Sequence, residues 1–306
     1  MAYVKPDAVI EQMVQAGTAK AHLAIHDLLL RGFLSGALLG FATTLALTGT
    51  IQTGVGIVGA LLFPVGFVII VLLGLELVTG NFALVPLAVM EGRSSLGQLL
   101  ANWGWVFVGN LIGGMFYAWL FSLTLTPEAA MAKQIVGIAE AKTLGYAHGG
   151  APGVVTVLSK AILCNWMVTL GVVMALTSQS TTGKIAAMWL PILTFFAQGF
   201  EHSVVNMFVI PAGMILGAKV SMTDWWLWNQ IPVTLGNVAG GLVFTALALY
   251  LTHKKGEVAL NASAHGEPSQ GAGAVLYSRP TRMASSQRAG TRAWSRVSAL
   301  RKEEGV

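Results

Sequence analysis

Charged side chains are scarce in this sequence. Only 10% of its 306 residues are Asp, Glu, Lys or Arg, whereas 55% are hydrophobic, and long apolar runs continue through most of the chain. Soluble globular domains carry about 25% charged residues, so the composition excludes that class. The sequence predicts a polytopic membrane protein.

Cysteine is nearly absent as well. Cys164 is the only one, and because it lies inside an apolar run we expect it to pack there rather than to form an intrachain disulfide. The chain also offers no nucleophile with a base and an orienting group, and no metal ligands at a recognisable spacing. We therefore expect a protein that is not an enzyme and that has no cofactor or metal.

The formal net charge of +5 comes largely from the ends of the chain. No aromatic-rich basic module accompanies it, which argues against nucleic-acid binding. After Lys254 the residues Ser, Ala, Gly and Arg dominate, and we expect residues 254–306 to form a disordered basic tail. Its arginines are either simply solvated, which is the interpretation we favour, or they bind anionic lipid.

The first 27 residues lack the charged start, the short apolar core and the cleavage site of a signal peptide. We expect the first membrane helix to act as its own signal. Between positions 6 and 22 the apolar residues recur at close to helical spacing. Residues 1–27 are therefore predicted to carry an amphipathic helix that lies on the membrane surface.

Residues 28–253 contain six apolar runs, and a membrane crossing takes about 20 residues. Polar residues interrupt the second and fifth runs, which resume near Phe82 and Met207. The predicted spans are at about 28–47, 55–90, 96–123, 154–177, 185–216 and 227–252, with a long polar connection over 124–153. Six spans put both termini on one side, and the excess of Lys and Arg there predicts the cytoplasm or its equivalent.

The two interruptions share the pattern Gly-x-Glu-x4-Asn, at Gly74–Asn81 and at Gly199–Asn206. Backbone that leaves a helix inside a membrane must be buried in protein or line a water-filled cavity. We therefore expect the two breaks to meet near the middle of the membrane. Each break exposes the positive end of a half-helix, and two such ends favour a small anion between them.

An internal repeat relates the two halves of the chain. Asn110 and Asn237 each stand in Gly-Asn-x-x-Gly-Gly, 127 residues apart (237 − 110), and Asn102 and Asn229 have the same offset. The first three spans therefore correspond to the last three. Because the number of spans in each repeat is odd, the halves insert with opposite orientations. The predicted fold is an all-α membrane protein with an inverted 3+3 repeat and broken second and fifth helices.

His202 is the main candidate for chemistry in the pathway, because its charge can change near physiological pH. The alternative is a neutral histidine that is hydrogen-bonded inside the bundle, but its place in a polar break favours the pathway. Thr79 either donates its hydroxyl into the pathway beside His202 or bonds its own loop. Four further residues of the two breaks are predicted to structure the loops, the carboxylates by capping loop backbone: Glu76, Asn81, Glu201 and Asn206.

Two polar residues of the fourth span are also candidates. Lys160 either reaches the membrane surface or adds positive potential at the mouth of the pathway, and Asn165 either joins helices or contacts the substrate. Large apolar residues near the breaks either pack against lipid and protein or form a hydrophobic constriction. They are Phe63, Phe67, Leu77, Val78 and Phe195.

At these residues the sequence resembles the formate/nitrite transporter family. The matching segments, spread over residues 6–254, are Phe63–Gly66, Glu76–Asn81, Asn102–Trp103, Gly109–Asn110, Ile162–Trp166, Phe200–Phe208 and Ile231–Asn237. The resemblance implies an aquaporin-like protomer of six helices, a homopentamer in the lipid bilayer, and one pore per protomer for small monovalent anions or their acids.

The resemblance also implies roles for single residues. His202 is the central histidine, Thr79 lies on the loop that breaks the second span, and Asn165 and Lys160 line the approach. Phe63 and Phe195 form one constriction, and Phe67, Leu77 and Val78 lie near the other. Two residues depart from the family's pattern, since Leu75 replaces a small residue and Val78 replaces a common aromatic.

The function predicted in this way is a channel or transporter for nitrite, formate or bicarbonate, either passive or coupled to a proton through His202. Bicarbonate is the substrate of an algal chloroplast branch of the family, so the membrane is either the cell membrane or a chloroplast envelope. The alternative is a channel for neutral solutes such as water, glycerol or ammonia.

Overall fold

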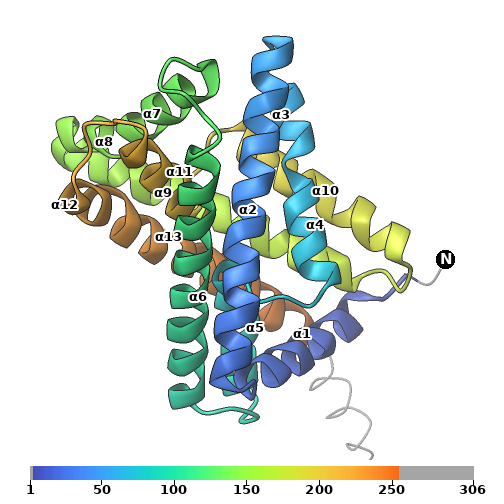
Figure 1. Cartoon of the computed structure of the whole chain (residues 1–306). Helices are drawn as coiled ribbons and strands as arrows, with labels where there is room; N and C mark the ends of the chain where they lie inside the picture. The colour runs from blue at the N-terminus through green and yellow to red at the C-terminus, as the bar shows by residue number, and fades with distance from the viewer. Residues whose placement is uncertain (1–2, 255–306) are drawn as a thin grey trace, which may run out of the picture. The chain divides into compact units, whose positions relative to one another are not determined.

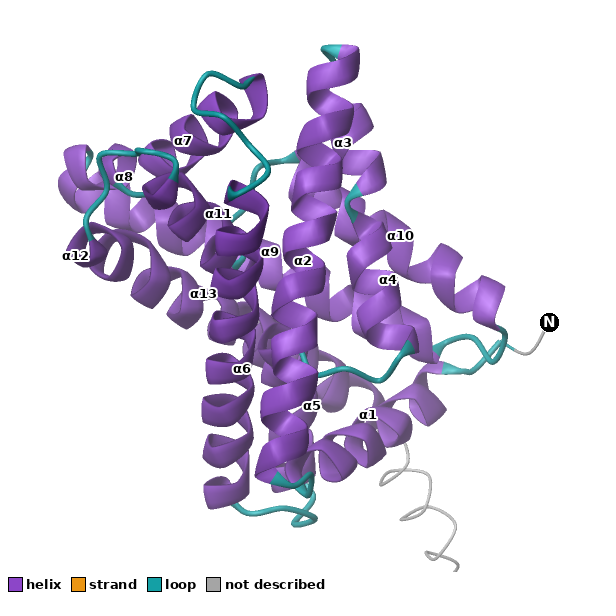
Figure 2. Cartoon of the chain, in the orientation of Figure 1, coloured by secondary structure: helices purple, strands orange, loops and turns teal. Residues whose placement is uncertain are grey.

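The computed structural model describes residues 3–254, which are helical apart from short connections (Figures 1 and 2). The first half contains α1 (Pro6–Ala21), α2 (Ile25–Thr53), α3 (Gly56–Leu62), α4 (Pro64–Leu72), α5 (Val78–Met90) and α6 (Leu96–Ser122). The second half contains α7 (Ala130–Lys142), α8 (Leu144–His148), α9 (Gly150–Leu176), α10 (Thr181–Ala197), α11 (Ser203–Ile215), α12 (Met222–Trp225), η1 (Trp226–Gln230), α13 (Ile231–Gly241) and η2 (Leu242–Leu247).

Four helices are long and apolar enough to cross a membrane: α2, α6, α9 and the continuous helix Met222–Lys254, which includes α12, η1, α13 and η2. Two further crossings each consist of two shorter pieces. The first is Gly56–Leu72 followed by α5, and the second is α10 followed by α11. The prediction of six spans with a broken second and fifth span is therefore confirmed.

The breaks are shorter than the sequence pattern predicted. A glycine with positive φ, Gly74 at 63° and Gly199 at 62°, follows the helix that ends each first piece. Such a backbone conformation suits glycine because it has no Cβ. The next helices begin already at Val78 and Ser203, so Asn81 and Asn206 lie in the first turns of α5 and α11 rather than in the interruptions.

Side-chain caps set the starts of several helices. Ser95 and Gln98 form a capping box that begins α6, and Ser221 and Asp224 form another at α12. Ser180 accepts from the Gly183 amide at the start of α10. Caps of this kind satisfy amides that have no partner within the helix, which explains why the chain turns at these points.

The duplicated unit also includes the short helix before each half, of which the first copy, α1, was predicted and the second, α7, was not. Asn102 donates to the carbonyl of Lys20 at the end of α1, and Asn229 donates to the carbonyl of Lys142 at the end of α7, both at 2.9 Å. Residues 124–153 are therefore more than a polar connection, because they contain the counterpart of α1. α1 packs on α5, and α7 packs on α11.

Glycines bring the long helices into close contact. A Cβ on Gly36 of α2 would lie 2.1 Å from the carbonyl oxygen of Asn110 in α6, and one on Gly240 of α13 would lie 2.3 Å from that of Ile162 in α9. No larger side chain fits there without moving the backbone. These are the equivalent helix pairs of the two halves, and Gly113 and Gly240 of the two Gly-Asn-x-x-Gly-Gly motifs lie in these contacts.

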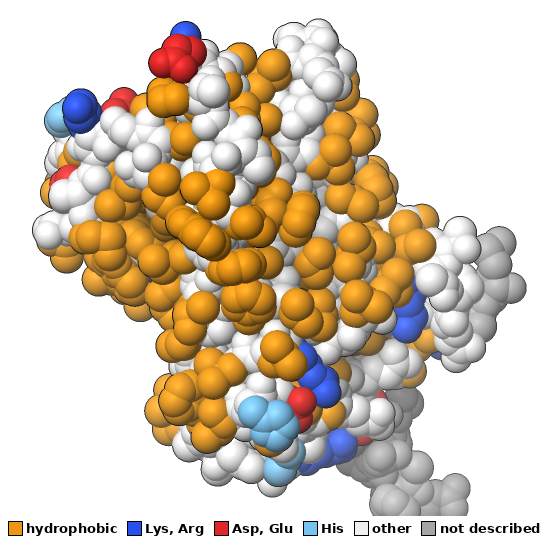
Figure 3. Space-filling view, in the orientation of Figure 1, with side chains coloured by type: hydrophobic (Ala, Val, Ile, Leu, Met, Phe, Trp, Pro, Cys, Tyr) orange, Lys and Arg blue, Asp and Glu red, His pale blue; other side chains and the backbone are white. Residues whose placement is uncertain are grey.

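The outer surface suits an apolar environment. Figure 3 shows hydrophobic side chains over the middle of one face, with most charged side chains toward its two ends. Large apolar residues are more than half exposed on several helices, among them Leu30, Phe41, Trp119, Leu190 and Leu235. In water, such a surface would be unfavourable, whereas lipid or neighbouring protein covers it at no such cost.

Candidate functional site

His202 and Thr79 meet where the two broken helices come together. Thr79 Oγ1 lies 3.1 Å from His202 Nε2, and both side chains are buried, with 0% and 2% exposure. His202 is also the N-cap of α11, where its Nδ1 accepts from the amide of Val205 at 3.2 Å. Since Nδ1 is an acceptor, the neutral imidazole carries its proton on Nε2 and donates to Thr79. The hydroxyl proton of Thr79 is then free to point at a third group.

The side chains of Asn110 and Asn237 hold the backbone of the two breaks. Asn110 Oδ1 accepts from the amide of Val78 at 3.0 Å, and its Nδ2 donates to the carbonyl of Glu76. Asn237 does the same in the second half, accepting from the amide of Ser203 at 2.9 Å and donating to the carbonyl of Glu201. Neither was predicted as a site residue, although both stood out as the anchors of the 127-residue repeat.

Asn165 connects the two halves at the same level. Its Nδ2 donates to the carbonyl of Thr79 at 3.1 Å and to the carbonyl of Asn237 at 2.6 Å. Its Oδ1 is buried and has no hydrogen-bond partner among the described residues. The Asn165 side chain joins helices, which was one of its two predicted roles. Contact between its unpaired Oδ1 and the substrate, the other predicted role, stays a prediction.

Each buried carboxylate of the breaks is bound by side chains. Glu76 accepts from Lys20 Nζ and from Asn81 Nδ2, each at 2.7 Å, and Asn81 Nδ2 also donates to Asn102 Oδ1. Capping of the loop backbone by Glu76 was predicted, but Asn110 holds that backbone instead. Lys20 was not predicted, because nothing near it in sequence indicates a partner 56 positions away.

Glu201 has a larger set of partners. Lys142 Nζ lies 2.8 Å from its Oε2, and Asn206 donates to the same oxygen at 2.8 Å. Tyr146 donates to Oε1 at 2.7 Å, an interaction with no counterpart at Glu76. Burial and the neighbouring carboxylate raise the pKa of Tyr146 well above its usual range, so its hydroxyl remains a donor. Here too, side chains rather than loop amides satisfy the carboxylate.

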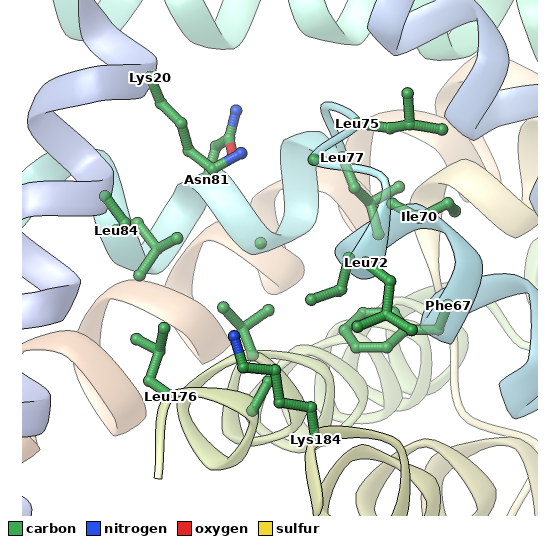
Figure 4. A pocket seen from close by; sticks show the side chains of 16 residues that line it. Lys20, Phe67, Ile70, Leu72, Leu75, Leu77, Asn81, Leu84, Leu176 and Lys184 are labelled. Atoms are coloured by element: carbon green, nitrogen blue, oxygen red, sulfur yellow. The ribbon is translucent and has the colours of Figure 1, made fainter. Parts of the chain in front are cut away.

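Two cavities lie near the His202–Thr79 pair: one is lined by Leu77 and Gly80, which flank Thr79 in the chain, and the other by His202 itself. The first, of about 260 Å³, is lined by Phe67, Leu77 and the two cations Lys20 and Lys184 (Figure 4). The second, of about 680 Å³, contains His202 in its lining. Its cations are Lys142 and Lys160. In Figure 1, α1 and α7, which contribute Lys20 and Lys142, lie toward opposite ends of α6.

Aromatic side chains narrow the space beside His202. The ring of Phe195 stacks on the imidazole with 5.6 Å between centroids, and Phe63 meets Phe195 edge-on at 5.6 Å. Phe195 lines the second cavity, whereas Phe67 and Leu77 line the first. Val78 lines neither cavity. Its side chain is fully buried, and its position is fixed by the bond from its amide to Asn110.

Lys160 lines the second cavity from α9. Its ammonium lies 6.0 Å from the centre of the Tyr146 ring, and its carbonyl accepts from the amide of Glu201. This position puts its charge at the wall of the cavity, near the helix break. Among residues 3–254, no three His, Cys, Asp or Glu side chains come together as a metal site. The arrangement offers hydrogen-bond donors and cations to a small solute, in a mostly apolar passage.

Comparison with known proteins gives a consistent result. The family model described as "Formate/nitrite transporter" matches residues 7–251. The chain is 38% identical to a probable formate transporter of Methanothermobacter thermautotrophicus, covering 78% of this chain and 97% of that protein. Among solved structures, an FNT family ion channel has a TM-score of 0.72 at 28% identity, covering 80% of this chain and 98% of that one. A pentameric formate channel with formate bound has a TM-score of 0.63 at 24% identity, covering 75% and 98%.

Proposed function

Since the chain belongs to the formate/nitrite transporter family, we propose that it conducts formate and nitrite across the membrane, past His202 and between the two cavities. The observation that carries this proposal is the buried His202–Thr79 pair with a cation-lined cavity near each of the two residues. The charged residues of the first cavity are Lys20 and Lys184, and those of the second are Lys142, Lys160 and Glu201. Glu201 is paired with Lys142, so its charge is balanced.

An anion without a hydrogen-bond donor is unfavourable in the apolar surroundings of the His202–Thr79 pair. Moving an unpaired charge into such surroundings costs several kcal/mol, because no water accompanies it. The Thr79 hydroxyl, oriented by His202, donates a hydrogen bond to the anion at this point. The amino-terminal ends of α5 and α11 add positive potential to the same place.

His202 shares a proton in this proposal and does not transfer it. If the neutral imidazole gave up its Nε2 proton, an imidazolate would remain, which is a very unstable species in a buried site. Prior protonation on Nδ1 would require the hydrogen bond from the Val205 amide to break. Conduction past the fixed His202–Thr79 pair is therefore passive.

The assembly and orientation extend the proposal. We infer a homopentamer with one pathway per protomer, supported by the likeness to a pentameric formate channel and by the exposed apolar surface. Both termini are proposed to face the cytoplasm, on the side of the cavity that contains Lys20 and Lys184. This orientation is supported by the excess of Lys and Arg at that end of the membrane.

A competitive uptake panel with reconstituted protein tests the substrate. Proteoliposomes are given isotopically labelled formate at pH 5.5 and 7.5 with nitrite or bicarbonate as competitors, and osmotic swelling with glycerol and urea is recorded in parallel. The proposal expects saturable uptake of formate that nitrite inhibits, with slow swelling. Rapid swelling without anion uptake would replace it with a channel for neutral solutes.

A further inference from the structure

The first cavity contains two lysines that differ in their pairing. Lys20 lies 2.7 Å from Glu76, so the two charges form a partly buried ion pair with no net charge. Lys184 lines the same cavity, and within residues 3–254 its ammonium has neither a carboxylate at salt-bridge distance nor a side-chain hydrogen bond. No Asp or Glu lines this cavity. Its net positive charge therefore comes from Lys184.

The start of α10 holds Lys184 in place. Ser180 caps the helix, and the amide of Lys184 donates to the Ser180 carbonyl at 3.0 Å, which fixes the first turn. Figure 4 shows the Lys184 side chain directed into the cavity, beside Leu176 and across from Lys20. The side chain is only partly exposed. The charge thus lies in the wall of the cavity, among apolar side chains and partly accessible to solvent.

Apolar walls increase the effect of this charge. Phe67, Ile70, Leu75, Leu77 and Leu84 make up much of the lining, and such low-dielectric walls focus the field of a charge into the space between them. The distance over which salt screens a charge is about 8 Å at physiological ionic strength, so an anion in the cavity still feels the ammonium. We propose that Lys184 is the residue that captures anions in the first cavity, a role that rests on the proposed function.

Comparison of the two halves of the repeat distinguishes Lys184 from Lys20 and Lys142. Lys20 and Lys142 occupy equivalent positions and both pair with a buried carboxylate. The position 127 residues before Lys184 is Ile57, an exposed apolar residue of α3. The second cavity has its own cation without a carboxylate partner among the described residues, Lys160, at an unrelated position on α9. The ion pairs of Lys20 and Lys142 therefore occur in both halves of the repeat. The proposed anion-capturing lysines, Lys184 and Lys160, differ between the two cavities and are not related by the repeat.

Bilayer recordings with formate as the main anion test this role. Removal of the charge in Lys184→Gln is expected to raise the concentration for half-maximal current about three- to tenfold and to leave the maximal current within about twofold, with a larger effect in Lys184→Glu. Both effects should fade at 1 M salt, where screening shortens to about 3 Å. Lys184→Arg should retain the apparent affinity of the wild type.

Two control variants, Lys160→Gln and Lys5→Gln, show whether the effect is specific to Lys184 and to current that enters from the first cavity. Lys184→Gln should reduce current that enters from the first cavity more than current in the reverse direction, and Lys160→Gln should produce the opposite rectification. Lys5→Gln removes an exposed lysine at the same end that does not line the cavity, and should change nothing. Unchanged affinity and rectification in both Lys184→Gln and Lys184→Glu, with wild-type oligomeric size, would overturn the inference. Absence of anion current in the wild type would instead contradict the proposed function.

Discussion

His202 and Thr79, 123 positions apart in the chain, are joined by a 3.1 Å contact between Nε2 and Oγ1 at the meeting point of two broken helices. Each residue belongs to the first turn or the cap of a half-helix, so the contact also joins the two halves of the repeat. In this geometry His202 orients the threonine hydroxyl, which is the donor that the proposed pathway offers to the anion.

Thr79→Val should reduce formate flux about tenfold in protein that still assembles at wild-type oligomeric size. The substitution keeps the size of the side chain but removes the hydroxyl donor, and the buried Nε2–H of His202 loses its partner, which lowers the free energy of unfolding by about 1–3 kcal/mol. Stopped-flow flux into proteoliposomes measures this effect. Thr79→Ser keeps the hydroxyl and should stay within about threefold of wild type, whereas equal flux in all three proteins would show that the hydroxyl has no part in conduction.

Glu201→Gln should destabilise the protein more than Glu76→Gln. Glu201 accepts from four side chains and Glu76 from two, and loss of either carboxylate leaves a lysine without its counter-charge. Breaking such a pair costs about 3 kcal/mol. Thermal unfolding in detergent provides the measurement. The double variant Lys142→Met with Glu201→Gln should recover part of the lost stability, and an identical melting temperature for both single variants would contradict the assignment.

Gly36→Ala should prevent assembly of the folded protein. Its Cβ would lie 2.1 Å from the carbonyl oxygen of Asn110, and that asparagine holds the first break, so the strain reaches the site. The matched control is Gly104→Ala, where a Cβ meets no atom within 4 Å. Yield of monodisperse protein in size-exclusion chromatography distinguishes them. Normal yield of Gly36→Ala would show that α2 and α6 pack less closely than described.

The contact of α1 with the turn before α6 should weaken in acid. Hydrogen bonding to Arg93 lowers the pKa of Glu11 below the ordinary value of 4.5, so the pair stabilises α1 above pH 4.5 and this contribution is lost as pH falls through the lowered pKa. The pair is partly exposed, so its contribution is below about 1 kcal/mol. Hydrogen exchange of α1 at pH 6 and pH 3.5 should show faster exchange in acid, corrected for intrinsic rates. Glu11→Gln should remove most of that difference, and a variant that keeps it in full would contradict the role of this pair.

Much of the fold follows from local patterns. Apolar length and the repeated Gly-x-Glu-x4-Asn predicted the six spans and the two breaks, and the 127-residue offset of Asn110 and Asn237 predicted the inverted halves. α7 was missed because only a few of its residues are buried and its sequence resembles a polar connection. The counterpart of α1 became visible only through the matching bonds of Asn102 and Asn229.

The candidate site was predicted less completely, for a physical reason. The placement of His202 in a polar break singled it out, and the corresponding break in the first half suggested Thr79. The ion pairs of Lys20 and Lys142 join residues 56 and 59 positions apart (201 − 142), so they depend on tertiary packing and leave no local signal. Lys184 likewise looks like an ordinary lysine at a helix start until the cavity beside it is seen.

Formate flux through His202 variants from pH 5 to pH 8 tests the central claim most directly. The account predicts that His202→Ala and His202→Phe, folded and of wild-type oligomeric size, reduce flux at least about tenfold at every pH, because the anion loses its oriented donor. Flux equal to that of the wild type in both variants across this pH range would show that the His202–Thr79 pair is not part of the conduction pathway.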